Sequence, residues 1–595
     1  MSLSLSVRGS RGLSLFEPTE GTQTGGPVTT WQPASDPDQA IQDGAKNVRV
    51  MAYSPAGDMF AWSNGVQVQV VGHSEGTWRP VAQIPHAKAS HLIFSPLGRI
   101  LATWEVFSTK AGQNPEPNLH LWNPKSGEKL ASFTQKKLAF WCPQWARDES
   151  VCCLRSPNNE VLFFRDNNFK DVDKRLSVAK MESFSFASTT EGQHHVICFI
   201  PGQKGGPSTA QLYAYPKFNP ETDVVAKKSF FQSDRMEVYW SWNGKNALLL
   251  TQSEVDKTGA SYYGKQQLHF VNTKGDTNQV HLAKDGPIHA LQWSPRDSLY
   301  CVVYGFMPAK ATLFNQKCEK VFDFGTGARN TVLFNPQGNL LMIGGFGNLR
   351  GNVEMWAVQA KREVCQFEAT DATDIRWSPN GKYLMTSTCA PRLRQGNGFK
   401  VWHYTSSLIF EHPIETPGEE LWEVAWQNAP PEKFLAFQIQ YKPVEGIQPK
   451  QPVASKEAYR PPGMRNKVST FKLHDEDEPA ENVRKPGAVA APNEELSRSA
   501  AKNRRRRMNR KDRAGGESGT AAANGREESP GEPKRSLEVT GDPIKDKKLR
   551  KLNDKLVQIA KLKERIKAGE TLELNQLEKI EKEQELTDEV NKLKL

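Results

Sequence analysis

One short sequence phrase recurs through the first 440 residues and limits the folds open to this chain more than any other feature. It consists of an aromatic residue, Ser or Asn, Pro, any residue and Gly, or a close variant, followed by a short apolar run. Close copies begin at Tyr53, Phe94, Trp293, Phe334 and Trp377, looser copies at Trp145, Trp242 and Trp426, and the weakest copy at Phe186. Neighbouring copies start 41 to 56 residues apart, with a mean of about 47. A sustained period of this length indicates a repeat architecture.

The residues of the phrase predict a β-hairpin. Pro and Gly suit a tight turn, so the aromatic residue ends one strand and the apolar run begins the next. In several copies another strand-like segment follows after about 25 residues, as in residues 119–123 (LHLWN) and 353–356 (VEMW). These three strands and a connecting strand make a four-stranded blade. Because the period is close to the ~40–45 residues of a WD-type blade, the sequence predicts an all-β WD-type β-propeller.

The number of phrases predicts nine blades, or eight if the weak copy at Phe186 is not one. The last unit is short, since residues 421–426 and 434–441 supply about two strands before Pro-rich sequence begins. The N-terminus offers the missing strands, because residues 3–7 and 13–16 alternate like strands on either side of an RGSRG turn. We therefore expect the N-terminal residues to complete the last blade and leave no open sheet edge.

Residues that build hydrophobic cores end near residue 440. All 15 Trp lie between Trp31 and Trp426, and all eight Cys lie between Cys142 and Cys389. We expect a propeller over residues 1–441, a disordered linker that is first Pro-rich and then basic over 442–540, and a charged amphipathic helical hairpin over 541–595. No apolar run approaches the ~18 residues of a membrane span. The sequence predicts a cytoplasmic protein with reduced thiols and no membrane partner.

Positive charge is concentrated in the last quarter of the chain. The formal net charge is +11, and residues 441–595 hold 35 basic and 27 acidic side chains, against 43 and 40 in residues 1–440. This surplus suits a polyanion such as RNA, although charge alone does not separate RNA from anionic lipid. The candidate contacts to RNA phosphates are Lys502, Arg504, Arg505, Arg506, Arg507, Arg510, Lys511, Arg513, Lys547, Lys548, Arg550 and Lys551. Arg offers paired donors to phosphate, and each neutralised phosphate releases counterions. A solvated charge run or a nuclear-import signal is the alternative for residues 502–513.

The C-terminal segment has the pattern of two helices. After Pro543, Leu and Ile recur at spacings of three and four amid Lys, and after Gly569 they resume amid Glu. A basic helix followed by an acidic one predicts an antiparallel, coiled-coil-like hairpin. The hairpin either packs only on itself or offers its narrow apolar stripe to a partner helix or an RNA–protein surface.

Two motifs of common enzyme classes are missing from the sequence. It has no G-x-x-x-x-G-K-[ST] and no H-E-x-x-H. The Gly-rich residues 344–351 (GGFGNLRG) precede a strand, whereas a dinucleotide-binding loop follows one, so they predict a blade turn. The histidines, His194 and His195 included, lack metal-ligand spacing. The sequence therefore predicts a non-enzymatic protein with no catalytic, cofactor-binding or metal-binding residues.

Several long and uncommon strings carry a family resemblance. They are residues 256–264 (DKTGASYYG), 304–311 (YGFMPAKA), 322–327 (FDFGTG), 345–351 (GFGNLRG), 388–394 (TCAPRLR) and 458–462 (AYRPP). With these strings the chain resembles the eukaryotic translation initiation factor 2A family, which is a WD-repeat family. The resemblance extends over the propeller, the linker and the terminal helices.

The resemblance implies a monomeric, non-enzymatic factor that directs initiator methionyl-tRNA to the small (40S) ribosomal subunit. It implies that delivery depends on the codon, needs no GTP and serves a subset of mRNAs, and the missing P-loop agrees with the second point. The implied partners are the 40S subunit, initiator methionyl-tRNA, mRNA and other initiation factors that bind the terminal helices. The alternative is a WD-repeat protein–protein scaffold in a ribonucleoprotein complex that does not bind tRNA directly.

Overall fold

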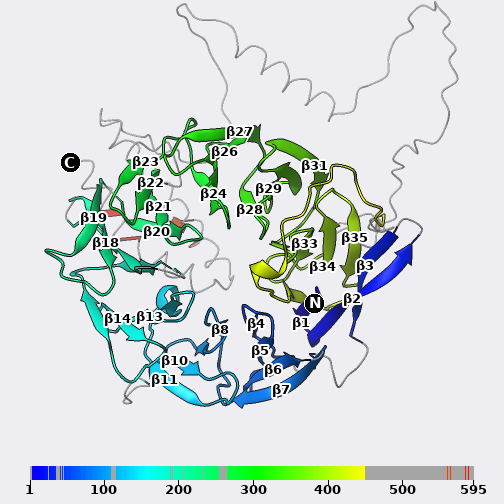
Figure 1. Ribbon diagram of the computed structural model, residues 1–595, viewed down its shortest axis with the longest axis horizontal. Coiled ribbons are helices and arrows are strands. Elements are labelled where there is room, and N and C mark those ends of the chain that lie inside the picture. Colours follow the sequence, from blue (N-terminus) through cyan, green and yellow to red (C-terminus); the bar gives the residue numbers. More distant parts are fainter. Residues whose placement is uncertain are drawn as a thin grey trace, which may run out of the picture. The chain divides into compact units, whose positions relative to one another are not determined.

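The structure is a computed structural model of the 595-residue chain. It describes residues 3–448 except 24–25, 35–40, 42, 45, 75, 109–115, 188, 190–191, 204–205, 232 and 254–263, and beyond them Leu556, Ile559, Ala560, Lys563, Glu583, Gln584, Thr587 and Asp588. The chain divides into two units, Met1–Tyr459 and Arg460–Leu595. The described residues of the first unit form a ring of nine four-stranded antiparallel sheets (Figure 1).

Each sheet is one blade, and its strands A to D follow one another from the centre of the ring to the rim (Figure 1). Blade 1 contains β4 (Val50–Tyr53), β5 (Met59–Ser63), β6 (Val68–Ser74) and β7 (Thr77–Ile84); blade 2 contains β8 (His91–Phe94), β9 (Leu101–Trp104), β10 (Leu119–Trp122) and β11 (Lys129–Phe133); blade 3 contains β12 (Gln144–Trp145), β13 (Val151–Arg155), β14 (Glu160–Arg165) and β15 (Lys174–Ser177); blade 4 contains β16 (Ser183–Phe186), β17 (His195–Ile200), β18 (Ser208–Ala214) and β19 (Val224–Phe230). A 3-10 helix, η1 (Leu138–Phe140), lies between blades 2 and 3 in the sequence.

The second half of the ring repeats the same order. Blade 5 contains β20 (Arg235–Trp240), β21 (Asn246–Gln252), β22 (Gln266–Asn272) and β23 (Thr277–Gln279); blade 6 contains β24 (Ile288–Trp293), β25 (Tyr300–Tyr304), β26 (Ala309–Phe314) and β27 (Lys320–Gly327); blade 7 contains β28 (Thr331–Phe334), β29 (Leu340–Gly345), β30 (Asn352–Ala357) and β31 (Arg362–Glu368); blade 8 contains β32 (Asp374–Trp377), β33 (Tyr383–Thr388), β34 (Gly398–His403) and β35 (Leu408–Pro413). Blade 9 combines β36 (Leu421–Trp426) with β1 (Leu5–Gly9), β2 (Gly12–Gln23) and β3 (Gly26–Pro33), and a second 3-10 helix, η2 (Pro431–Lys433), follows it in the sequence.

The nine-blade prediction is confirmed, and the weak phrase at Phe186 ends the inner strand of blade 4. One predicted phrase start is wrong by two residues, because β20 ends at Trp240 rather than Trp242. Asn246 N donates to Ser241 Oγ over 3.0 Å, which is the turn contact that the phrase serine also makes in other blades. Trp242 occupies the place of the phrase proline and is 38% exposed. Two tryptophans on either side of one serine made the register ambiguous.

The phrase aromatics also connect neighbouring blades. Trp293 Nε1 donates to the Tyr239 carbonyl of the preceding blade over 2.8 Å. Trp377 Nε1 donates to the Leu333 carbonyl over 3.3 Å in the same way. The hydrophobic core lies between blades as well, and each of its clusters combines side chains of adjacent sheets. One repeated phrase therefore reverses the chain and holds the ring together.

The N-terminal strands close the ring, as the sequence predicts. Strand β1 pairs with β36 in antiparallel fashion, with Leu5 opposite Trp426. The expectation of a second strand at residues 434–441 is wrong, because β1 already occupies the edge of β36 where that strand would pair. The chain instead crosses blades 7 and 8, where the Phe437 ring lies 5.3 Å from that of Tyr404. We call residues 434–447 the strap.

The strap remains in contact with blade 8 beyond residue 441. Ser407 Oγ donates to the Val444 carbonyl over 2.5 Å, and Ile447 N donates to the Leu408 carbonyl over 2.7 Å. A fragment intended to contain the whole propeller must therefore include these residues.

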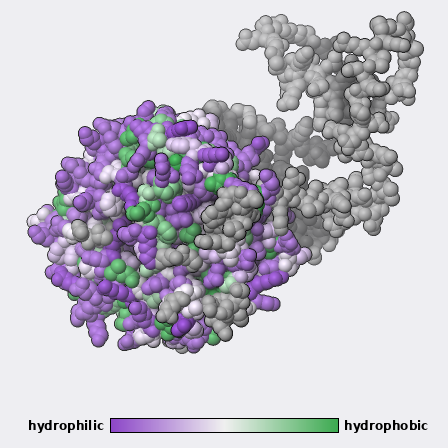
Figure 2. All heavy atoms as spheres, turned by 45° about the vertical axis from the view of Figure 1, so that its right-hand side comes forward, coloured by the Kyte–Doolittle hydropathy of each residue, from purple (hydrophilic) through white to green (hydrophobic). Residues whose placement is uncertain are grey.

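The second unit is described at eight positions, all with helical backbone, and Lys563 Nζ contacts the Glu583 carboxylate there. Most of the predicted linker and of the predicted helical hairpin lies outside the described residues, so both stay predictions. The described helical residues form no segment that is long and apolar enough to cross a membrane. The face in Figure 2 is mainly hydrophilic, with hydrophobic residues in scattered spots.

Candidate functional site

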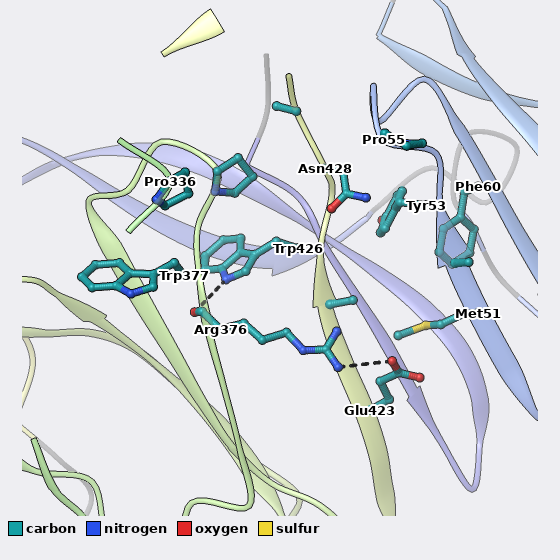
Figure 3. A pocket seen from close by; sticks show the side chains of 14 residues that line it. Met51, Tyr53, Pro55, Phe60, Pro336, Arg376, Trp377, Glu423, Trp426 and Asn428 are labelled. Carbon is teal, nitrogen blue, oxygen red and sulfur yellow. Dashed lines mark hydrogen bonds and ion pairs between the residues drawn. The ribbon is translucent and has the colours of Figure 1, made fainter. Parts of the chain in front are cut away.

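A cavity of about 540 Å³ opens between the inner strands of blades 8, 9 and 1, with a turn of blade 7 also in its wall (Figure 3). Its walls come from equivalent positions of the repeat: the phrase aromatics Tyr53, Trp377 and Trp426, the phrase prolines Pro55, Pro336 and Pro379, and the residues Ala52, Arg376 and Ala425 that precede the aromatics. The turn after each inner strand brings the prolines beside the aromatic rings. The cavity is thus formed by the repeat itself, at the place where the two ends of the ring join.

Arg376 and Glu423 bring an ion pair to this cavity. Arg376 Nε lies 2.8 Å from Asp374 Oδ2, and Arg376 Nη2 lies 3.4 Å from Glu423 Oε1. The other oxygen of Glu423 lies 3.2 Å from Arg8 Nη2. Figure 3 shows the Arg376–Glu423 pair and the hydrogen bond from Trp426 Nε1 to the Arg376 carbonyl, which is 3.4 Å long. Strands β1, β32 and β36 are therefore tied together by charge along one wall.

Tyr53 contributes a neutral hydroxyl beside the cavity. The hydroxyl is hydrogen-bonded to Ser6 of blade 9. Burial raises the pKa of Tyr53 far above its ordinary value, and the hydrogen bond to Ser6 opposes this only in part. The phenol therefore stays protonated at physiological pH and serves as a link between blades.

The cavity has the composition of a binding site. The described residues that line it include no Ser, Cys, His or Lys, so they offer no pair of nucleophile and base. Its volume is typical of ligand sites, and its aromatic and proline walls suit an apolar or aromatic group of a partner. Among the residues that the structure describes, no group of three or more His, Cys, Asp or Glu could hold a metal ion.

The twelve candidate RNA contacts of the tail, Lys502 to Arg513 and Lys547 to Lys551 as named above, all lie outside the described residues. Their role stays a prediction. The histidines discussed from the sequence behave as core residues where the structure describes them. His194 is hydrogen-bonded to Thr189 Oγ1 over 2.7 Å and to Ser150 Oγ over 3.2 Å. Burial lowers the pKa of His194, so its ring is neutral.

Sequence reasoning did not find the cavity, although a signal existed. The residue before the phrase aromatic is Gln or Arg in three blades, as Gln144, Gln292 and Arg376. The first two side chains reach the following blade, because Gln144 Oε1 accepts from Phe186 N over 2.7 Å and Gln292 Oε1 accepts from Phe334 N over 2.6 Å. A polar residue at this position therefore marks a contact between inner strands, and the register of the repeat would have shown it.

Three of the family-like strings lie in equivalent loops. Residues 304–311, 345–351 and 388–394 include the B–C loops of blades 6, 7 and 8, and the inner strands all run in one direction, so these loops share one face of the ring. We call them the loop arc. The Gly-rich segment is a blade turn, as predicted. A Cβ on Gly347 would lie 2.7 Å from Arg392 Nη2, so neighbouring loops of the arc are in close contact.

The loop arc exposes cations and apolar side chains together. Arg350, Arg392 and Arg394 are exposed, and Arg394 Nε lies 3.4 Å from Glu420 Oε1. At the blade 6 end, Phe306 is 49% and Met307 45% exposed. These exposed residues are accessible to a partner. Large apolar side chains on a surface commonly mark an interaction site.

Comparison with known proteins agrees with these observations. The family profile described as "Eukaryotic translation initiation factor eIF2A" matches residues 228–424, which include blades 5 to 8 and the loop arc. The chain is 36% identical to eukaryotic translation initiation factor 2A of Drosophila melanogaster, over 98% of this chain and 99% of the fly protein. It is 31% identical to the factor 2A of Caenorhabditis elegans, over 91% and 92% of the two chains.

A solved structure described as "Crystal structure of the eukaryotic initiation factor" is also similar. It is 28% identical, with a TM-score of 0.61, and the match covers 72% of this chain and all of that one. One assignment accounts for the nine-bladed ring, for the family-like strings in its loops and for the 36% identity to the fly protein over nearly the whole chain. The chain belongs to the eukaryotic translation initiation factor 2A family of non-enzymatic initiation factors.

Proposed function

We propose that this protein directs initiator methionyl-tRNA to the small (40S) ribosomal subunit in a codon-dependent, GTP-independent manner and serves a subset of mRNAs. The observation that carries the proposal is the 36% identity to a translation initiation factor over 98% of the chain. The absence of a P-loop motif from the sequence supports GTP-independence. Cytoplasmic translation is the setting that this function requires.

The proposed mechanism divides the work between two parts of the chain. The propeller is a rigid scaffold whose loops can recognise a ribosomal or protein surface. The exposed Arg350, Arg392 and Arg394 of the loop arc support this role. The tail carries a surplus of eight positive charges and would hold the RNA backbone, with Arg504 to Arg507 as its densest run. The terminal helices would bind other initiation factors.

A binding assay with separate parts tests this division. The full chain, a chain ending at residue 459 and a full chain with Arg504 to Arg507 changed to Glu are each titrated with 40S subunits and with initiator tRNA. We expect the full chain to bind both, the shortened chain to keep 40S binding through the loops, and the charge-reversed chain to lose tRNA affinity. Cutting at residue 459 leaves the strap in place, so the propeller is not disturbed.

The alternative is a protein–protein scaffold, and the same assay separates it from the proposal. A scaffold predicts that the purified full chain has no affinity for tRNA at physiological salt and still associates with ribosomal particles through protein contacts. Equal tRNA binding by the full and charge-reversed chains would contradict the role given to the Arg run.

A further inference from the structure

A small basic pocket lies between blades 2 and 3 and shares no lining residue with the cavity described above. It has a volume of about 210 Å³ and is formed by the D–A loop that contains η1 and by the B–C loop of blade 3. Its walls include Lys136, Lys137, Phe140, Arg155 and Asn159. We call it the cation–aromatic pocket.

Phe140 is held rigidly in the wall of this pocket. Arg155 Cζ lies 4.2 Å from the centroid of its ring. The guanidinium of Arg155 is itself fixed, because Nη2 donates to the Met181 carbonyl over 2.8 Å and further bonds join it to the Glu182 carbonyl and to Asn159 Oδ1. The aromatic ring therefore rests on an anchored cation, so little side-chain freedom remains to be lost on binding.

Two exposed lysines of the same loop each lie near an aromatic ring. Lys137 Nζ lies 6.0 Å from the Phe140 centroid, and Lys136 Nζ lies 5.6 Å from the Phe107 centroid. Neither lysine has an ion-pair partner among the described residues, and Glu182 is a carboxylate that acts on the Arg155 guanidinium. Three of the seven cation–ring contacts in the described part of the chain occur here, so cations and aromatic rings alternate more densely than elsewhere.

Single-stranded RNA is the partner that this chemistry fits. Proteins hold single strands with a basic groove along the phosphates and aromatic rings against the bases, a combination that tolerates any base. The pocket is too small for a drug-sized ligand and has room for one planar ring system. We propose that the cation–aromatic pocket binds one nucleotide of a single-stranded RNA, with the base on Phe140 and the flanking phosphates on Lys136 and Lys137. This places an RNA contact on the propeller, in addition to the one proposed for the tail.

Affinity measurements with the full chain test the pocket. The probe is a fluorescent 12-nucleotide oligouridine, titrated at several salt concentrations. Changing both Lys136 and Lys137 to Glu should weaken binding about tenfold and lower the salt slope by about 1.4, because two phosphates are no longer neutralised. Phe140→Ala should weaken binding by about tenfold without changing the salt slope, and Phe140→Trp should retain affinity because it still stacks.

A matched control comes from the opposite face of the same blade. Lys125 lies in the exposed turn between β10 and β11, so Lys125→Glu changes the net charge without touching the pocket. It should leave oligouridine affinity nearly unchanged. An equal loss for Lys125→Glu and for single Lys136→Glu would overturn the proposal, because the effect would then come from net charge alone.

Cross-linking locates the contact independently of the tail. Oligouridine that contains 4-thiouridine is irradiated on the full chain, and the cross-linked peptides are identified by mass spectrometry. We expect a cross-linked peptide that includes Phe140. Cross-links confined to residues 449–595, together with unchanged affinity of the lysine variant, would overturn the proposal and leave the pocket to a protein partner. Failure of the proposed function would appear in a different assay, as a lack of tRNA and 40S binding by the unchanged full chain. The pocket variants are not used in that assay.

Discussion

Arg8 and Glu423 are 415 positions apart in the sequence, yet Arg8 Nη2 lies 3.2 Å from Glu423 Oε2. Their side chains are 15% and 24% exposed, and they join the second strand of blade 9 to its first. Because Glu423 also contacts Arg376 of blade 8, this carboxylate links three strands. The ring is thus closed by charge as well as by the β1–β36 ladder.

The Arg8–Glu423 pair should contribute measurably to stability. A double-mutant cycle with Arg8→Ala and Glu423→Ala should give a coupling free energy of unfolding of about 1–2 kcal/mol, since the pair is largely withdrawn from water. Urea unfolding followed by circular dichroism measures it. Arg11 and Glu419 provide the matched control: the Arg11 side chain is 68% exposed, so the coupling should be no more than about 0.5 kcal/mol. Equal couplings for both pairs would contradict this account.

Removing residues 1–33 should open the ring. The deletion takes three of the four strands of blade 9 and uncovers the cluster that contains Leu5, Phe16 and Trp31. We expect the shortened chain to lose its cooperative unfolding transition and to aggregate. A synthetic peptide of residues 1–34 added during refolding should restore the transition. A shortened chain with the stability of the full one would show that the N-terminal strands are dispensable.

The register of blade 5 can be checked by comparing Trp242 with Trp293, which is the phrase aromatic of blade 6. Trp293 is 7% exposed and donates a hydrogen bond to the preceding blade, so Trp293→Ala should cost about 3–5 kcal/mol of unfolding free energy. Trp242 stands on an exposed turn, so Trp242→Ala should change it by no more than about 0.5 kcal/mol. Chemical denaturation of both variants measures the difference. A large loss for Trp242→Ala would favour the register expected from the sequence.

His269 should make stability depend on pH. Both of its ring nitrogens lack hydrogen-bond partners among the described residues, and burial, with a smaller effect from Lys228, lowers its pKa from 6.5 to about 4. Between pH 4 and pH 6.5, only the unfolded chain binds a proton at His269. The free energy of unfolding is therefore highest above pH 6.5 and falls as the pH drops towards 4. His269→Phe should therefore raise the unfolding free energy at pH 5 by roughly 1–2 kcal/mol relative to its effect at pH 7.5.

The control for this titration is His281→Phe, because the His281 side chain is exposed. The unfolding free energy of the His281→Phe variant should change with pH in the same way as that of the unchanged protein. The dependence will not vanish in the His269 variant, since burial also lowers the pKa of His86 and His403 to about 4. Parallel curves for His269→Phe and the unchanged protein would contradict the prediction.

Charge reversal in the tail should affect RNA binding and leave the fold intact. Changing Arg504 to Arg507 to Glu removes four cations, so the slope of log K against log salt for tRNA or mRNA should fall by about 3. The thermal unfolding of the propeller should be unchanged, which circular dichroism checks in the same preparations. An unaltered slope would show that these arginines do not neutralise phosphates.

The sequence predicted the features that the repeat determines. The number of phrases predicted nine blades, and alternation around the RGSRG turn placed the N-terminal strands in the last one. It placed the start of the blade 5 phrase at Trp242 instead of Trp240, because both tryptophans fit the pattern equally well. It assigned a strand to residues 434–441, because alternation does not show that the edge of β36 is already occupied. The cavities depend on contacts between blades, which a pattern within one repeat does not contain.

Ring closure by the N-terminal strands also bears on how the protein is made. Strands β1 to β3 leave the ribosome roughly 390 residues before β36 does. At about 5–20 residues per second, they wait about 20 to 80 seconds for the strand that they pair with. During that time Leu5, Val7 and Phe16 lack the side chains of blade 8 and β36 that cover them in the folded ring, so the nascent chain exposes apolar surface and needs protection by chaperones. Residues after 427 are still being synthesised when β36 emerges, so the ring can close while the chain remains bound to the ribosome.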